Sequence, residues 1–98
     1  MSITIDRTDA LAERLFGATL GALELCAVYL GAELGLYRVL DERGPLTARE
    51  LARAGGIAPR YAHEWLEQQA VAGLLDVDDA DAGPEARRFA LPEEHARV

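Results

Sequence analysis

The 98-residue chain has 10 basic residues, all of them arginine, and 17 acidic residues, which gives a net charge of −7. This length allows one domain and is too short for an open nucleotide-binding sheet with its crossover helices, so most enzyme architectures are excluded. Half of the residues are hydrophobic and 28% are charged, as in a soluble globular domain. The negative charge disfavours nucleic acid as a partner, because phosphate backbones are bound mainly through lysine and arginine.

The cysteine and histidine content indicates no chemistry within this chain. Cys26 is the single cysteine, so it can form neither an internal disulfide nor a structural zinc site. We therefore expect a cytoplasmic protein, and the first residues lack the basic-then-apolar order of a secretory signal. His63 and His95 lie in different elements, where surface or helix-packing roles are expected, and no glycine-rich phosphate loop is present. The sequence predicts no catalytic residue, no cofactor-binding residue and no metal ligand, which favours an association module.

The first long element is a predicted helix from about residue 10 to residue 30. Residues 1–9 are expected to form an N-terminal tail, at whose end Thr8 or Asp9 can cap the helix. Apolar residues recur at alternating spacings of four and three, which predicts a stripe facing the core. This heptad stripe consists of Leu11, Leu15, Ala18, Ala22, Leu25 and Tyr29.

The same helix is also apolar outside the heptad stripe, and Glu24 is the only charge between Leu15 and Ala32. Such a helix must be buried on more than one side, in a bilayer, inside a larger protein or at a subunit interface. The position of Glu24 and the absence of lysine or an aromatic belt at the flanks disfavour the bilayer. We expect contact with a partner chain or a further domain through Phe16, Leu20, Leu23 and Tyr29.

Two features of this helix leave alternatives open. Gly17 and Gly21 either let a second helix approach closely or fit a tight core. Glu24 is expected to reach the edge of the apolar surface, to pair with an arginine across the interface, or to face a substrate.

A winged helix-turn-helix is predicted for residues 45–92, after apolar dimerisation helices over residues 10–44. A second helical segment from Ala32 to about Glu42 ends at Gly44-Pro45. Thr47 and Glu50 then have the spacing of a capping box at the start of a helix over residues 48–54. A further helix runs from Pro59 to about residue 72, and two strand candidates flank an acidic turn. The fold class is mainly α with a small β-hairpin, and residues 93–98 begin a linker helix.

The charges oppose the DNA-binding role that a winged helix commonly has. Between Pro59 and Ala72 the charged residues are one arginine and two glutamates, and five acids without a base occupy residues 76–85. Arg87 and Arg88 form a basic doublet that we expect to be solvated. A duplex would be repelled by the acidic wing.

Several motifs from about Phe16 onward match the pattern of a known family. They are the run from Leu30 to Leu40, Gly44-Pro45-Leu46-Thr47, Glu50-Leu51-Ala52, Arg60-Tyr61, Glu64-Trp65-Leu66, Gln69-Ala70, Gly73-Leu74-Leu75 and the segment from Phe89 to Ala96. Together they resemble the N-terminal winged-helix (dimerisation) domain of bacterial class I S-adenosylmethionine-dependent methyltransferases.

The resemblance implies an accessory domain that builds a homodimer and covers the substrate side of a separate catalytic domain. That domain, with a Rossmann-like fold, would bind S-adenosylmethionine; it would follow Val98, so the chain is expected to be non-catalytic by itself. The chain is then either an excised piece of a longer enzyme or a stand-alone protein that kept the interface. The alternative function is a small winged-helix transcriptional regulator that binds DNA; no membrane association is expected.

Overall fold

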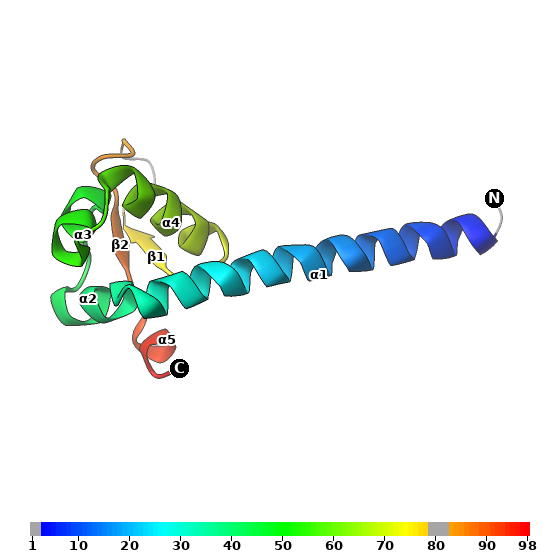
Figure 1. Ribbon diagram of the computed structural model, residues 1–98, viewed down its shortest axis with the longest axis horizontal. Helices are drawn as coiled ribbons and strands as arrows, with labels where there is room; N and C mark the ends of the chain where they lie inside the picture. The colour runs from blue at the N-terminus through cyan, green and yellow to red at the C-terminus, as the bar shows by residue number, and fades with distance from the viewer. Residues whose placement is uncertain (1–2, 79–82) are drawn as a thin grey trace.

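A computed structural model describes residues 3–78 and 83–98 of the chain (Figure 1). The elements in chain order are α1 (Ile3–Glu33), α2 (Leu36–Arg43), α3 (Ala48–Gly55), α4 (Pro59–Val71), β1 (Asp76–Asp78), β2 (Arg88–Ala90) and α5 (Glu93–Ala96). The strands β1 and β2 form an antiparallel hairpin. A mainly helical chain with a helix-turn-helix and a hairpin is a winged helix, as predicted.

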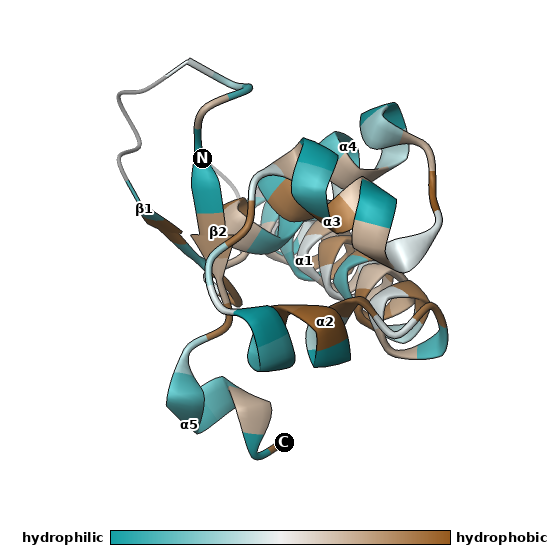
Figure 2. Ribbon diagram, turned by 90° about the vertical axis from the view of Figure 1, so that its left-hand side faces the viewer, coloured by the Kyte–Doolittle hydropathy of each residue, from teal (hydrophilic) through white to brown (hydrophobic). Residues whose placement is uncertain are grey.

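The molecule has a winged-helix body, formed by α2 to α5 with the hairpin, and a long helix that projects from it (Figure 1). The body's core contains side chains from α2, α3, α4 and β2, with Leu36, Leu51, Leu66 and Phe89 at most 1% exposed. Figure 2, which looks nearly along α1, shows polar positions on the outer faces of α2 and α3. The projecting helix gives the chain dimensions of 55 × 29 × 26 Å.

The capping box at the start of α3 is confirmed. The backbone N–H of Glu50 donates to Thr47 Oγ1 at 3.2 Å, and the Thr47 N–H donates to Glu50 Oε1 at 2.9 Å. These hydrogen bonds from Thr47 lower the pKa of the Glu50 carboxyl. The helix ends at Gly56, whose φ of 69° is left-handed and therefore accessible to glycine at little cost.

The wing is fixed to the body through β2 and the residue that precedes it. Phe89 is paired with Val77 in the hairpin and also exchanges backbone hydrogen bonds with Leu46, at 2.8 and 3.0 Å. Arg87 Nη1 lies 2.7 Å from Glu67 Oε1 of α4, with both side chains less than one third exposed. The prediction of a solvated arginine doublet is therefore wrong for Arg87, because the hairpin brings it against an acid 20 residues away.

The first two helices differ from their predicted bounds. α1 begins at Ile3, so the expected tail is helical from residue 3, and Thr8 and Asp9 lie inside the helix rather than at its cap. No glycine or proline interrupts residues 3–9, and Asp6 in the first turn faces the positive end of the helix dipole. Gly35, with φ of 72°, separates α1 from α2, which begins at Leu36 rather than Ala32.

Candidate functional site

The C-terminal part of α1 is anchored to the body at Trp65. The indole Nε1 of Trp65 donates to the carbonyl oxygen of Ala27 at 2.9 Å. Gly31 lies one turn later against the same ring, where a Cβ atom would meet the indole and stand 2.7 Å from Tyr37 Cε2. The Tyr37 and Trp65 rings meet edge to face, with centroids 5.1 Å apart. α1 can approach the two rings this closely because residue 31 has no side chain.

A hydrogen-bonded polar pair lies beside this anchor and joins Tyr37 of α2 to Gln69 of α4. The Tyr37 hydroxyl donates to Gln69 Oε1, and the Gln69 amide donates to Gln68 Oε1 at 2.7 Å. Gln69 is fully buried, and burial raises the pKa of Tyr37, which keeps its hydroxyl protonated as a donor. The sequence placed Gln69 only on a helix face, because a contact across 32 residues leaves no signal in periodicity.

α1 projects beyond the anchor (Figure 1), and along its length it carries large apolar side chains that its own chain leaves uncovered. The four residues predicted to contact a partner are all more than half exposed: Phe16 65%, Leu20 51%, Leu23 61% and Tyr29 64%. They are therefore accessible to a second chain or domain, as the prediction requires. The contact itself stays a prediction.

The heptad stripe does not face the core of this chain, so that prediction is wrong. Leu11, Leu15 and Leu25 are more than half exposed, as is Tyr29. The side of α1 that faces the body is marked by Ala27 and Gly31. Leu25 and Tyr29 each lie two positions from Ala27, which is about 200° around the helix axis from it. The heptad stripe, to which both belong, therefore lies on the side of α1 opposite the body.

The two glycines in the middle of α1 are not part of a tight core in this chain. A Cβ atom at Gly17 or Gly21 would meet nothing within 4 Å. Glu24 is half-buried and forms neither an ion pair nor a hydrogen bond within the part of the chain that the structure describes. Its pairing, edge and substrate-facing interpretations all stay predictions.

By length and composition alone, α1 could also cross a membrane. Over Asp6–Glu33 it has a window of mean hydropathy 1.6, of which 6% is buried. One such helix is a weak indication, since core helices of soluble proteins and N-terminal signal segments have the same properties. An acidic residue inside the apolar run, Glu24, opposes insertion at a cost of about 2.5 kcal/mol or more.

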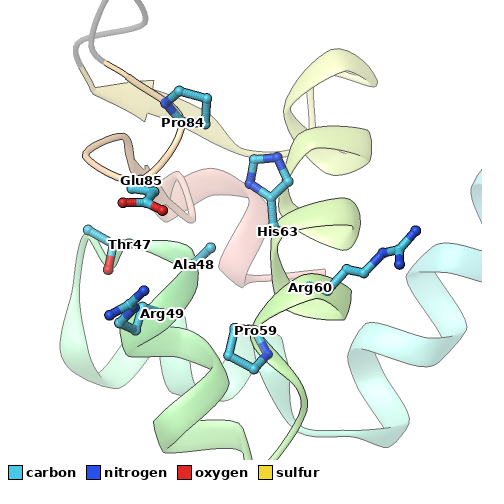
Figure 3. A pocket seen from close by; sticks show the side chains of 8 residues that line it. All are labelled: Thr47, Ala48, Arg49, Pro59, Arg60, His63, Pro84 and Glu85. Atoms are coloured by element: carbon cyan, nitrogen blue, oxygen red, sulfur yellow. The ribbon is translucent and has the colours of Figure 1, made fainter.

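An open depression of about 530 Å³ lies between the starts of α3 and α4 and the segment before β2 (Figure 3). His63 and Glu85 lie on opposite sides of it, while Arg60 points outward. Thr47, at its edge, is already engaged in the capping box. The described residues contain no group of three side chains placed to hold a metal ion. The depression offers no assembled catalytic pair or metal site.

The second histidine, His95, connects two segments of the chain. His95 Nδ1 lies 2.8 Å from the carbonyl oxygen of Leu74, which ties α5 to the segment between α4 and β1. This is the packing role that the sequence favoured for a histidine without metal-ligand neighbours.

The surface that a DNA duplex would meet carries charges of both signs. Exposed Arg60 and Glu64 share the outer side of α4, and Glu67 is engaged with Arg87. Of the five acids predicted on the wing, Asp76, Asp78 and Glu85 are exposed, and Asp79 and Asp81 lie outside the described residues. The described part of the wing thus keeps the acidic character that opposes a phosphate backbone.

A comparison with known protein families shows to which family the chain belongs. Residues 18–98 match the sequence model of the Rv2258c-like winged HTH domain. The chain belongs to this family. A comparison with curated proteins gives no match.

Solved structures of methyltransferases contain a region similar to this winged HTH domain. The mitomycin 7-O-methyltransferase MmcR is 30% identical, with a TM-score of 0.73 over 95% of this chain and 25% of its own. The S-adenosylmethionine-dependent methyltransferase SibL is 30% identical, with a TM-score of 0.64 over 90% of this chain and 23% of its own. CalO1, a methyltransferase in calicheamicin biosynthesis, is 29% identical over 98% and 25%, with a TM-score of 0.62. The resemblance found in the sequence is confirmed, and the chain spans about a quarter of these enzymes.

Two further winged helices share the fold alone. A MarR family protein from Bacillus stearothermophilus is 20% identical and RV1404 from Mycobacterium tuberculosis is 22% identical, both with a TM-score of 0.53. They cover 94% and 99% of this chain. The winged HTH domain is therefore related in sequence to methyltransferases more strongly than to these proteins.

Proposed function

We propose that this winged HTH domain is the association and substrate-lid domain of an S-adenosylmethionine-dependent methyltransferase and forms a homodimer through α1. The observation that carries the proposal is the uncovered apolar surface of α1, in a chain similar to a quarter of each of three methyltransferases. The domain itself performs no chemistry. The cofactor would be held by a separate catalytic domain with a Rossmann-like fold.

The energetics of α1 support an association role. Burying one large aliphatic or aromatic side chain is worth about 1.5–3 kcal/mol, and α1 leaves eight such side chains more than half exposed: Leu11, Leu15, Phe16, Leu20, Leu23, Leu25, Tyr29 and Leu30. Apolar patches of this kind mark interaction sites in soluble proteins. A partner that covers α1 would supply the burial that the body does not.

The position of the apolar surface relative to the body supports the lid role. Phe16, Leu20 and Leu23 lie on α1 beyond its anchor at Trp65, where a neighbouring domain can reach them without displacing the core. A substrate-binding domain that contacts this part of α1 would be closed on one side by an apolar wall. We also propose a cytoplasmic location, since Cys26 is unpaired and an oxidising compartment offers it no internal disulfide partner.

DNA binding is the competing function, and the charge distribution opposes it. The test is a titration of the protein against mixed-sequence duplex DNA at low salt, where electrostatic binding is strongest. We expect no salt-sensitive binding at micromolar protein. Micromolar or tighter binding that weakens as salt is added would favour the transcriptional regulator instead.

The methyltransferase assignment is tested by the reading frame that encodes the chain. We expect the codons after Val98 to specify a strand, a glycine-rich turn and an acidic residue about 20 positions later. A stop codon, or a continuation without these features, would contradict the assignment to a catalytic methyltransferase.

A further inference from the structure

The heptad stripe of α1 has an internal symmetry that the proposed association does not require. Its six positions are equidistant in pairs from residue 20, so that reversing the direction of the helix reproduces the same pattern. The pairs match in size, large with large at both ends and small with small in the centre: Leu11 with Tyr29, Leu15 with Leu25, and Ala18 with Ala22.

From this symmetry we propose that α1 pairs with α1 of a second copy in an antiparallel direction, about a two-fold axis at residue 20. The inference rests on the proposed homodimer and specifies its direction and register. An isologous interface requires that residue i contacts residue j and that j contacts i. Antiparallel pairing at this register satisfies that condition for every member of the heptad stripe, which lies on the side of α1 opposite the body.

The positions beside the heptad stripe allow the two helices to approach closely. On one side they are Ala12, Thr19 and Cys26, and on the other they are Arg14, Gly21 and Val28. At the two-fold axis each helix would contribute Thr19 and Gly21 at the flanks, so no bulky side chain separates the backbones there. Arg14 is the only charge among these six positions, and in this register it lies level with residue 26 of the second copy, two residues from Glu24 of that copy.

Charge and side-chain shape favour the antiparallel direction over the parallel one. In a parallel pair each acid of α1, including Glu13 and Glu24, would lie level with its own copy, and no charge pairs would form beside the seam. Parallel dimers favour β-branched residues at one of the two seam positions, and the heptad stripe contains none. Antiparallel helices also place opposite dipole ends side by side.

Cysteine crosslinking tests the register because one native cysteine lies beside the seam. In the proposed pair, Ala12 of one copy faces Cys26 of the other, and both positions are exposed on α1. We expect Ala12→Cys in the otherwise native protein to give a covalent dimer with a short bismaleimide reagent. The native protein should not, because its two Cys26 residues lie about 18 Å apart along the axis. The matched control is Ala12→Cys combined with Cys26→Ser, which should also stay uncrosslinked.

A second variant reports the opposite direction. Leu11→Cys combined with Cys26→Ser would place two cysteines level with each other in a parallel pair, and about 27 Å apart along the axis in the antiparallel pair. Efficient crosslinking of this variant would overturn the register while leaving a dimer and the proposed function intact.

The oligomeric state measured on the same samples tests the homodimer separately from the antiparallel direction of its helices. A native protein that sediments as a monomer would contradict the proposed homodimer and this pairing together. A monomer that co-floats with phosphatidylcholine vesicles would show that lipid, rather than a second copy, covers the heptad stripe. A dimer in which Ala12→Cys is crosslinked through Cys26 is the result that the antiparallel pairing predicts.

Discussion

The Trp65 indole and the Ala27 carbonyl oxygen are joined by a hydrogen bond of 2.9 Å that connects the winged-helix body to α1 across 38 residues. This bond, with Gly31 against the same ring, fixes the rotation of α1 about its axis. Because one side of α1 is held at Trp65, the heptad stripe on the opposite side remains uncovered. The core of the body therefore determines which face of α1 is offered to a partner.

Replacing the anchor should loosen α1 without unfolding the body. Trp65→Phe keeps an aromatic ring and removes the N–H donor, and we expect a loss of about 1–3 kcal/mol in the free energy of unfolding. Urea denaturation measures this loss, and hydrogen exchange should become faster near Ala27. The matched control is Tyr61→Phe on the exposed side of α4, which should change stability little. Equal effects of the two substitutions would contradict an anchor at Trp65.

Two glycines of α1 should respond to alanine in opposite directions. Gly31→Ala places a Cβ against the Trp65 and Tyr37 rings, and overpacking of this kind costs about 1–3 kcal/mol. Gly17→Ala meets open space and should stabilise the helix by up to about 1 kcal/mol. Thermal unfolding of both variants measures whether Gly31→Ala lowers the stability and Gly17→Ala raises it. A neutral Gly31→Ala substitution would contradict the close approach of α1 to Trp65.

The capping box should give α3 a pH-dependent stabilisation. Since the pKa of Glu50 is lowered in the folded state, its contribution is present above the unfolded value of about 4.3 and is lost as the pH falls through the lower folded value. Thr47→Ala should cost about 1 kcal/mol at pH 7. Urea titrations of the native and Glu50→Gln proteins from pH 7 to about pH 3 should show the difference between them shrinking as Glu50 is protonated, because Thr47→Ala keeps the backbone N–H that donates to Glu50 Oε1. A difference in the free energy of unfolding that stays constant with pH would show that ionised Glu50 does not stabilise α3.

The ion pair between Arg87 and Glu67 should couple the wing to α4. We expect a coupling free energy of about 0.5–1 kcal/mol, since both side chains are partly screened by solvent. A double-mutant cycle with Arg87→Gln and Glu67→Gln measures it directly. The pair Arg97 and Glu93, which is more than three quarters exposed at 3.5 Å, serves as a comparison with little expected coupling. Strictly additive effects at Arg87 and Glu67 would contradict the coupling.

Local sequence signals predicted the winged-helix body well. Thr47 and Glu50 identify the start of α3, Pro59 the start of α4, and the change from helical to alternating periodicity identifies the hairpin. Each of these signals acts within a few residues, so neighbouring positions in the sequence are sufficient to reveal it.

The candidate site was only half predictable. The sequence showed that α1 is apolar on several sides, and the four residues predicted to contact a partner are exposed, while the contact itself stays a prediction. It could not show which face is held by the body, because that depends on Trp65 meeting Ala27 from 38 residues away. The heptad stripe was therefore predicted to face the core of the chain, although it lies opposite that core. Arg87 was misinterpreted for the same reason, since its acid partner comes from another element.

Association through α1 is tested most directly by sedimentation equilibrium of the native protein beside Leu25→Glu, which places a charge in the exposed heptad stripe. We predict twice the 10.6 kDa chain mass for the native protein and a monomer for the variant. Arg38→Glu, which changes charge on the exposed side of α2, should remain a dimer. A native protein that stays monomeric at its highest soluble concentration, or a Leu25→Glu dimer as tight as the native one, would contradict the account.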